Sequence, residues 1–196
     1  MTDREPQLSE RDIEYVTAEY RTLEQLCDGR PISAEEVRGH IDAGRLPRPT
    51  YTLPDGTDMF PPDYFAVLDG AGSVEGMREY FEKRHQSASS ALGLTIDPEE
   101  DWQGYLSGQF GVCLREVTPE AMVEKAALVA EIDRLTAVPN PEDEGWRAEL
   151  ADAVDDLDEL ERPFTDFDRA RWGTVSRDTH VAAVRLRYLS SDATRG

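Results

Sequence analysis

Apolar side chains recur at helical spacing along most of the chain, and charged residues fill the positions between them. Residues 9–20 form the first such segment, with Ser9 as its N-cap. The clearest pattern covers residues 144–161, whose apolar stripe consists of Trp146, Leu150, Val154, Leu157 and Leu160. A helix that opens at Thr118 precedes it, so residues 117–161 are expected to form an antiparallel helix hairpin. The pattern predicts a mainly helical protein.

Two more helices are predicted in the middle of the chain, over residues 74–92 and from Asp97 onward. The second contains the sequence WQGYLSGQFGVCLREV, in which glycine recurs at i, i+4 and i+7 as Gly104, Gly108 and Gly111. Each glycine costs a helix about 1 kcal/mol relative to alanine, so something should compensate. We favour close helix packing; the alternative is a ligand that meets the backbone, flanked by Trp102, Tyr105 and Phe110. After Pro163 the pattern does not decide between helix and strand.

The segment from Arg21 to Leu68 has the capping and turn residues expected of two short helices followed by a β-hairpin. Thr22 and Ser33 each stand three residues before a Gln or Glu, which is the spacing of a capping box. Pro54-Asp55-Gly56 supplies a turn between two strand-like runs. The arrangement resembles the winged helix-turn-helix of MerR regulators. We therefore expect a winged helix-turn-helix-like module over residues 1–70 and a helical domain over residues 71–196, whose C-terminal segment is rich in arginine.

The charge of the chain is strongly acidic, with 41 Asp and Glu against 21 Lys and Arg, a net charge of −20. Such a charge repels nucleic acid, which is not expected as a partner. Residues 139–161 hold ten acids and one arginine, whereas residues 162–196 hold seven arginines and four aspartates. No apolar run is long enough to cross a bilayer, and the polar N-terminus is unlike a secretory signal. A cytoplasmic protein without membrane contact is expected.

Few residues have a pattern that points directly to chemistry. Cys113 lies in an apolar run, which is typical of a buried inert thiol; a nucleophile would need a nearby base or positive charge. Three scattered histidines and an acidic helix face, without a calcium loop, do not predict a metal site. No cofactor can be assigned. Arginines and aspartates cluster after Pro163, as Asp166, Asp168, Arg169, Arg171, Arg177 and Asp178. They indicate either recognition of an anionic small molecule or internal pairing with the preceding acidic helix, and we favour the pairing.

Three motifs, LEQLC…LPRPTYTLPDG, YLSGQFGVCLREVTPE and ERPFTDFDRARWGTVSRD, together with Lys125, resemble an uncharacterised bacterial domain of unknown function labelled as natural product biosynthesis proteins. The resemblance covers roughly residues 13–188. It implies an accessory or small-molecule-handling role, either binding or catalysis. The positions that match its motifs are Tyr105, Ser107, Gly108, Gly111, Cys113, Arg115, Thr118, Glu120, Lys125, Asp168, Arg169, Arg177 and Asp178.

Candidate site residues follow from the chemistry and the resemblance together. The candidates for catalysis are Cys113, Lys125 and Tyr105. The candidates for binding a small anionic metabolite are Trp102, Tyr105, Arg115, Asp168, Arg169 and Arg177. A biosynthetic partner protein is a second possible partner, and the acidic surface could dock a basic one. The sequence fixes neither the reaction nor the oligomeric state.

The main alternative is a MerR-like DNA-binding regulator with residues 34–43 as recognition helix. Its phosphate contacts would come from Arg38, Arg45 and Arg48. However, Glu35 and Glu36 stand where such a helix presents its residues to base edges. Between Arg21 and Asp69 there are nine acids and five arginines, so this segment is itself net negative. A scaffold reused for a purpose other than DNA binding is the favoured hypothesis.

Overall fold

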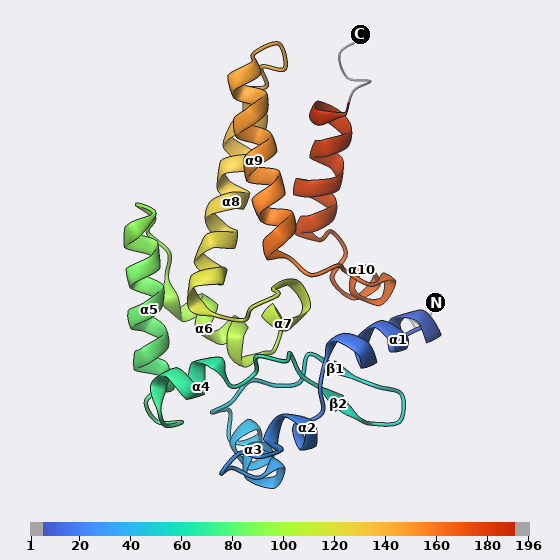
Figure 1. Ribbon diagram of the computed structural model, residues 1–196, viewed down its shortest axis with the longest axis vertical. Helices are drawn as coiled ribbons and strands as arrows, with labels where there is room; N and C mark the ends of the chain where they lie inside the picture. Colours follow the sequence, from blue (N-terminus) through green and yellow to red (C-terminus); the bar gives the residue numbers. More distant parts are fainter. Residues whose placement is uncertain (1–5, 191–196) are drawn as a thin grey trace, which may run out of the picture.

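The computed structural model describes residues 6–190 and shows a mainly helical protein with one small antiparallel sheet (Figure 1). The sheet pairs β1 (Tyr51–Thr52) with β2 (Asp58–Met59). The helices before the sheet are α1 (Glu10–Glu19), α2 (Leu23–Cys27) and α3 (Ala34–Asp42). Those after it are α4 (Ala66–Ala71), α5 (Met77–Ala91), α6 (Pro98–Leu106), α7 (Phe110–Cys113), α8 (Pro119–Ala137), α9 (Glu144–Leu160), α10 (Asp166–Trp172), η1 (Arg177–Ala182) and η2 (Arg185–Leu189).

The helix starts predicted from capping residues are confirmed. Ser9, Thr22 and Ser33 each accept a hydrogen bond from the backbone N–H three residues on, and each closes a full capping box. Gly44 and Gly56 have left-handed φ values of 67° and 87°, which end α3 and complete the hairpin turn. Local chemistry therefore sets the boundaries of these elements, because each cap satisfies backbone donors that the helix leaves open.

The single helix predicted from Asp97 onward is wrong, because the chain breaks at Gly108. α6 ends at Leu106, Gly108 adopts φ 80°, and α7 is a separate helix of four residues. A Cβ on Gly108 would collide with the carbonyl oxygen of Arg48 and lie 3.0 Å from that of Pro49. At Gly111 it would collide with the Thr50 hydroxyl. The glycines thus permit close packing, as expected, but against the loop before the hairpin and not along one helix.

The apolar side chains form three adjoining cores. The largest contains Leu23 and Val37 from the N-terminal part together with Phe81 and Leu114 from the helical part. Side chains from both sides of residue 70 therefore share one core, and the division into two domains stays a prediction. A smaller core joins α1 and the sheet to Val112 of α7. This packing fixes α7 between the N-terminal part and the long helices.

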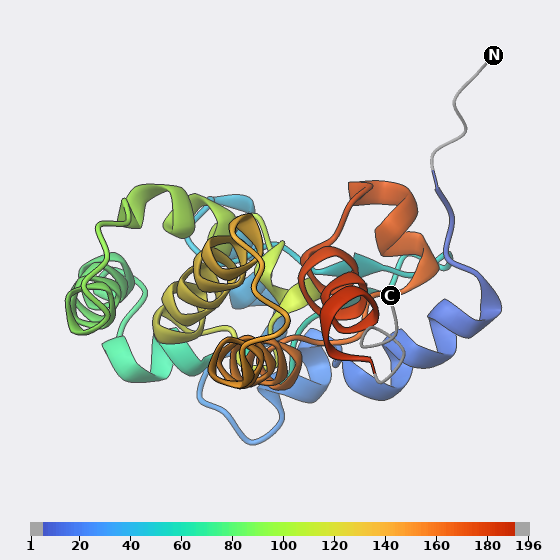
Figure 2. The same ribbon diagram turned by 90° about the horizontal axis from the view of Figure 1, so that it is seen from above.

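The long helices α8 and α9 lie side by side, and the last helix packs against them (Figures 1 and 2). After α10 the chain continues as one helix with two π-type stretches, η1 and η2. This answers the question that the sequence left open for the segment after Pro163. Residues 1–5 and 191–196, which belong to the expected terminal segments, lie outside the described residues. Between residues 6 and 190, no helix is long and apolar enough to cross a membrane.

Candidate functional site

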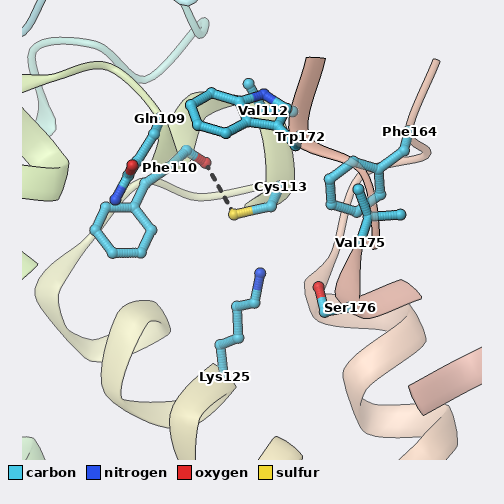
Figure 3. Close-up of a pocket in the computed structure, with 9 residues that line it drawn as sticks. All are labelled: Gln109, Phe110, Val112, Cys113, Lys125, Phe164, Trp172, Val175 and Ser176. Atoms are coloured by element: carbon cyan, nitrogen blue, oxygen red, sulfur yellow. Dashed lines mark hydrogen bonds between the residues drawn. The ribbon is translucent and has the colours of Figure 1, made fainter. Parts of the chain in front are cut away.

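A pocket of about 230 Å³ opens where α7, α8 and the segment around α10 meet (Figure 3). We call it the Cys113 pocket. Its walls are mostly apolar, and Cys113, Lys125 and Ser176 form its polar end. The full lining is Gln109, Phe110, Val112, Cys113, Lys125, Phe164, Trp172, Val175 and Ser176. These residues come from three separate stretches of the chain, so the pocket exists only in the folded protein.

Backbone hydrogen bonds hold Cys113 beside the end of α9. After α7 the chain becomes extended at Leu114, which forms an antiparallel bridge with Glu161. The Arg162 N–H donates to the Cys113 carbonyl over 2.8 Å, and the Arg115 N–H donates to the Leu160 carbonyl over 3.1 Å. The short α7 is therefore attached to the end of the long acidic helix, which brings the thiol and the Glu161 carboxylate into the same region.

Lys125 and Glu161 form a buried ion pair behind the polar end of the pocket. Lys125 Nζ lies 2.9 Å from Glu161 Oε1; the Glu161 side chain is fully buried, and that of Lys125 is 18% exposed. The Ser176 hydroxyl donates to the same carboxylate oxygen. Burial alone would lower the pKa of the Lys125 ammonium, but the Cys113 sulfur, once it is ionised, and the Glu161 carboxylate raise that pKa above its usual value. Lys125 is therefore charged at neutral pH.

The Cys113 thiol lies beside Lys125, whose side chain points toward the sulfur (Figure 3). Sγ also lies 3.6 Å from the Phe110 carbonyl oxygen. Burial raises the pKa of the thiol, and the Lys125 charge offsets this only in part. The thiol is therefore protonated at neutral pH, which is typical of an inert cysteine and not of an activated nucleophile.

Alkylation of Cys113 by iodoacetamide should consequently be slower at pH 7–8 than alkylation of a free cysteine in solution. A raised pKa means less thiolate at a given pH, so the rate should rise about tenfold per pH unit and show no plateau at the pKa of an ordinary thiol. Peptide mass spectrometry against pH measures this, with N-acetylcysteine in the same tube as the reference. A plateau near neutral pH would show an activated thiolate and contradict the assignment.

Trp102 and Tyr105, two of the predicted ligand-binding residues, lie in the largest core and not at this pocket. Both rings pack against Phe81, at 5.2 Å and 5.6 Å between centroids. Burial raises the pKa of the Tyr105 hydroxyl. That hydroxyl has no hydrogen-bond partner among residues 6–190, and it borders a cavity of about 10 Å³, the size of one water molecule. Tyr105 therefore does not line the pocket with Cys113 and Lys125, although Cys113 also belongs to this core.

Two of the three predicted arginines, Arg169 and Arg177, form ion pairs within the protein. Arg169 makes two bonds to Asp178, of 2.7 and 2.8 Å, and Arg177 pairs with Asp158 of α9. The pair of Arg177 with α9 is of the kind favoured from the sequence, whereas Arg169 pairs with an aspartate of its own segment. Arg115 is exposed and lines a separate groove of about 450 Å³, whose acidic residues are Glu116, Glu120, Glu124, Asp156 and Glu159.

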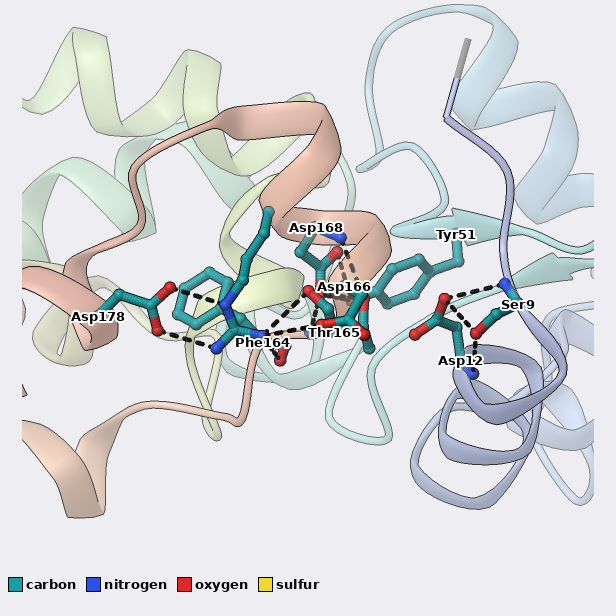
Figure 4. Close-up of polar contacts among 9 residues, drawn as sticks. Ser9, Asp12, Tyr51, Phe164, Thr165, Asp166, Asp168 and Asp178 are labelled. Carbon is teal, nitrogen blue, oxygen red and sulfur yellow. Dashed lines mark hydrogen bonds and ion pairs between the residues drawn. The ribbon is translucent and has the colours of Figure 1, made fainter. Parts of the chain in front are cut away.

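Asp168 ties α10 to the small sheet (Figure 4). Asp168 is fully buried and closes the capping box of Thr165. Both of its carboxylate oxygens lie 3.0 Å from the Tyr51 hydroxyl oxygen, which donates to them. Asp168 thus positions α10, which carries Trp172 to the pocket, and it does not line the pocket itself.

Sequence reasoning missed Glu161, Ser176, Phe164 and Trp172. A signal for Glu161 was present, because it continues the apolar stripe of Leu150, Val154 and Leu157 at helical spacing. A carboxylate on the buried face of a helix needs a charged partner, and Lys125 is one of two lysines in the chain. The other three residues follow an irregular segment whose course the pattern did not determine.

The protein is mainly helical, and one end of its Cys113 pocket carries a thiol, an ammonium and a hydroxyl group. The chain belongs to a family of unknown function, DUF6058, whose model matches residues 77–189. The match includes every residue of the Cys113 pocket and leaves out the N-terminal helices and the sheet. No curated protein matches the chain, and no solved structure does.

Proposed function

We propose that this protein binds a small, mainly apolar molecule in the Cys113 pocket, with the polar group of that molecule against Lys125. The observation that carries the proposal is a mostly apolar pocket of about 230 Å³ with a half-buried ammonium at one end. Apolar cavities of about 150 Å³ are large enough to hold benzene. An apolar body fixed by a few convergent polar groups is the usual design of a small-molecule site.

Binding is favoured over nucleophilic catalysis by the state of the thiol. A cysteine nucleophile needs a base within hydrogen-bond reach of its proton. The Sγ of Cys113 donates to the Phe110 carbonyl, the Lys125 ammonium beside it is not a base, and the nearby Glu161 carboxylate is already paired with Lys125 and Ser176. An accessory role in natural product biosynthesis stays a prediction that rests on the sequence resemblance alone.

The binding proposal predicts that a side chain added inside the pocket abolishes ligand uptake. Val175→Phe places an aromatic ring in the pocket, whereas Val138→Phe makes the same change at a side chain that is 78% exposed. With the uncharged dye N-phenyl-1-naphthylamine, fluorescence should rise saturably for the wild type and for Val138→Phe, and by less than a tenth as much for Val175→Phe.

Both variants must first show wild-type far-UV circular dichroism, because overpacking can itself cost stability. Equal dye uptake by the two folded variants would mean that the dye binds elsewhere. The proposal that the Cys113 pocket is the binding site would then be wrong.

The N-terminal part is proposed to be a winged helix-turn-helix-like scaffold reused without DNA binding. Glu35 and Glu36 occupy the first turn of α3, and Arg38 is paired with Glu24 of α2. Arg45 lies 3.9 Å from Glu75, and Arg48 is exposed. Fluorescence anisotropy with the DNA upstream of the gene for this protein tests the alternative; specific nanomolar binding at low salt would make the regulator the better hypothesis.

A further inference from the structure

The charges at the polar end of the Cys113 pocket already balance. Lys125 is the one charged residue among the nine that line the pocket, and its counter-charge is Glu161. The Glu161 side chain is fully buried, so water and salt screen it little. A buried ion pair is tolerated only when each charge has its partner. A second anion at Lys125 would leave one carboxylate uncompensated in an apolar site.

The pocket lining holds no second cation to pair with an anionic ligand; the exposed Arg171 lies outside the lining, with its guanidinium 4.9 Å from the centroid of the Trp172 ring. Arg162 is buried, and its guanidinium donates to the carbonyls of Leu114 and Arg115. Arg177 pairs with Asp158 and donates to the backbone at the end of α9. The guanidinium groups of Arg162 and Arg177 are thus engaged by the protein.

Hydrogen bonding at Lys125 has room for one more acceptor. An ammonium carries three N–H donors and no acceptor. Glu161 takes one of them, and the Cys113 sulfur lies beside another. A carbonyl oxygen from a ligand can take the third without adding charge, and the walls formed by Phe110, Phe164 and Trp172 suit an apolar or aromatic body.

We infer that the ligand of the Cys113 pocket is an uncharged, mainly apolar compound whose carbonyl oxygen accepts a hydrogen bond from Lys125, such as an aryl amide, ester or ketone. The inference rests on the proposed function and narrows its ligand class. It differs from the anionic metabolite expected from the sequence, because Arg169 and Arg177 are paired within the protein and Arg115 lines a separate groove.

Isothermal titration calorimetry with 2-naphthamide and 2-naphthoate tests the inference, since the two compounds share one ring system and differ in charge. The wild type should bind the amide at least about tenfold more tightly than the carboxylate, a difference of about 1.4 kcal/mol. Glu161→Gln leaves the Lys125 charge without compensation and should reverse the preference. Asp156→Asn removes an exposed carboxylate from the same helix and should leave the preference unchanged.

Tighter binding of 2-naphthoate by the wild type would overturn the inference and leave the binding proposal in place. Binding of neither compound would also overturn it, and the binding proposal would fail as well only if the N-phenyl-1-naphthylamine signal were absent. If Glu161→Gln does not fold, as judged by circular dichroism, the wild-type comparison decides alone, because it needs no substitution.

Discussion

Replacing Lys125 by methionine is expected to lower the free energy of unfolding by about 3–5 kcal/mol. The substitution keeps the apolar stem but leaves the fully buried Glu161 carboxylate without its counter-charge. Lys83→Met is the matched control, because Lys83 is the other lysine of the chain and is exposed on α5; its effect should stay within about 0.5 kcal/mol. Urea unfolding followed by circular dichroism measures both.

The double variant Lys125→Met/Glu161→Gln should recover most of this loss. Glutamine removes the unpaired charge and keeps an acceptor for the Ser176 hydroxyl. A double-mutant cycle then gives the coupling between the two side chains. If the losses of the two single variants simply add, Lys125 and Glu161 are not coupled. Their charges would then not balance each other at the polar end of the pocket.

Gly108→Ala is expected to lower the free energy of unfolding by about 2–5 kcal/mol, from about 1–2 for the left-handed backbone and about 1–3 for overpacking. The backbone φ of Gly108 is 80°, and a Cβ would press on the carbonyls of Arg48 and Pro49. The loop before the sheet and the start of α7 would have to separate, and α7 carries Cys113.

Gly44→Ala separates the two causes of this loss. Gly44 has φ 67°, close to that of Gly108, but a Cβ there would meet no atom within 4 Å. It should therefore show the backbone cost alone, about 1–2 kcal/mol. Equal losses in the two alanine variants, measured by urea unfolding, would mean that close packing at Gly108 contributes nothing.

How much of the fold could be predicted depended on whether the cause is local. The caps at Thr22 and Ser33 act within one helical turn, so the sequence was enough to place α2 and α3. The break at Gly108 comes from contact with Arg48, some sixty residues away, which no local pattern contains. The last helix likewise packs on α9 through Val181 and Val184, contacts that join separate parts of the chain.

The candidate site was predictable only in part, for the same reason. Cys113 and Lys125 were both selected from the sequence, but their meeting depends on the backbone bonds that join α7 to the end of α9. Arg169 and Arg177 looked suited to a ligand because arginine suits carboxylates, and the fold supplies those carboxylates from Asp178 and Asp158. Arginine and acid patterns alone do not distinguish internal pairing from a binding site.

The most direct test of the central claim is a crystal structure of the wild-type protein grown with 2-naphthamide. We expect the naphthalene ring between Phe164 and Trp172, with the amide oxygen within hydrogen-bond distance of Lys125 Nζ. Density for the compound only in the acidic groove beside Arg115, or none in the Cys113 pocket at saturating concentration, would contradict it.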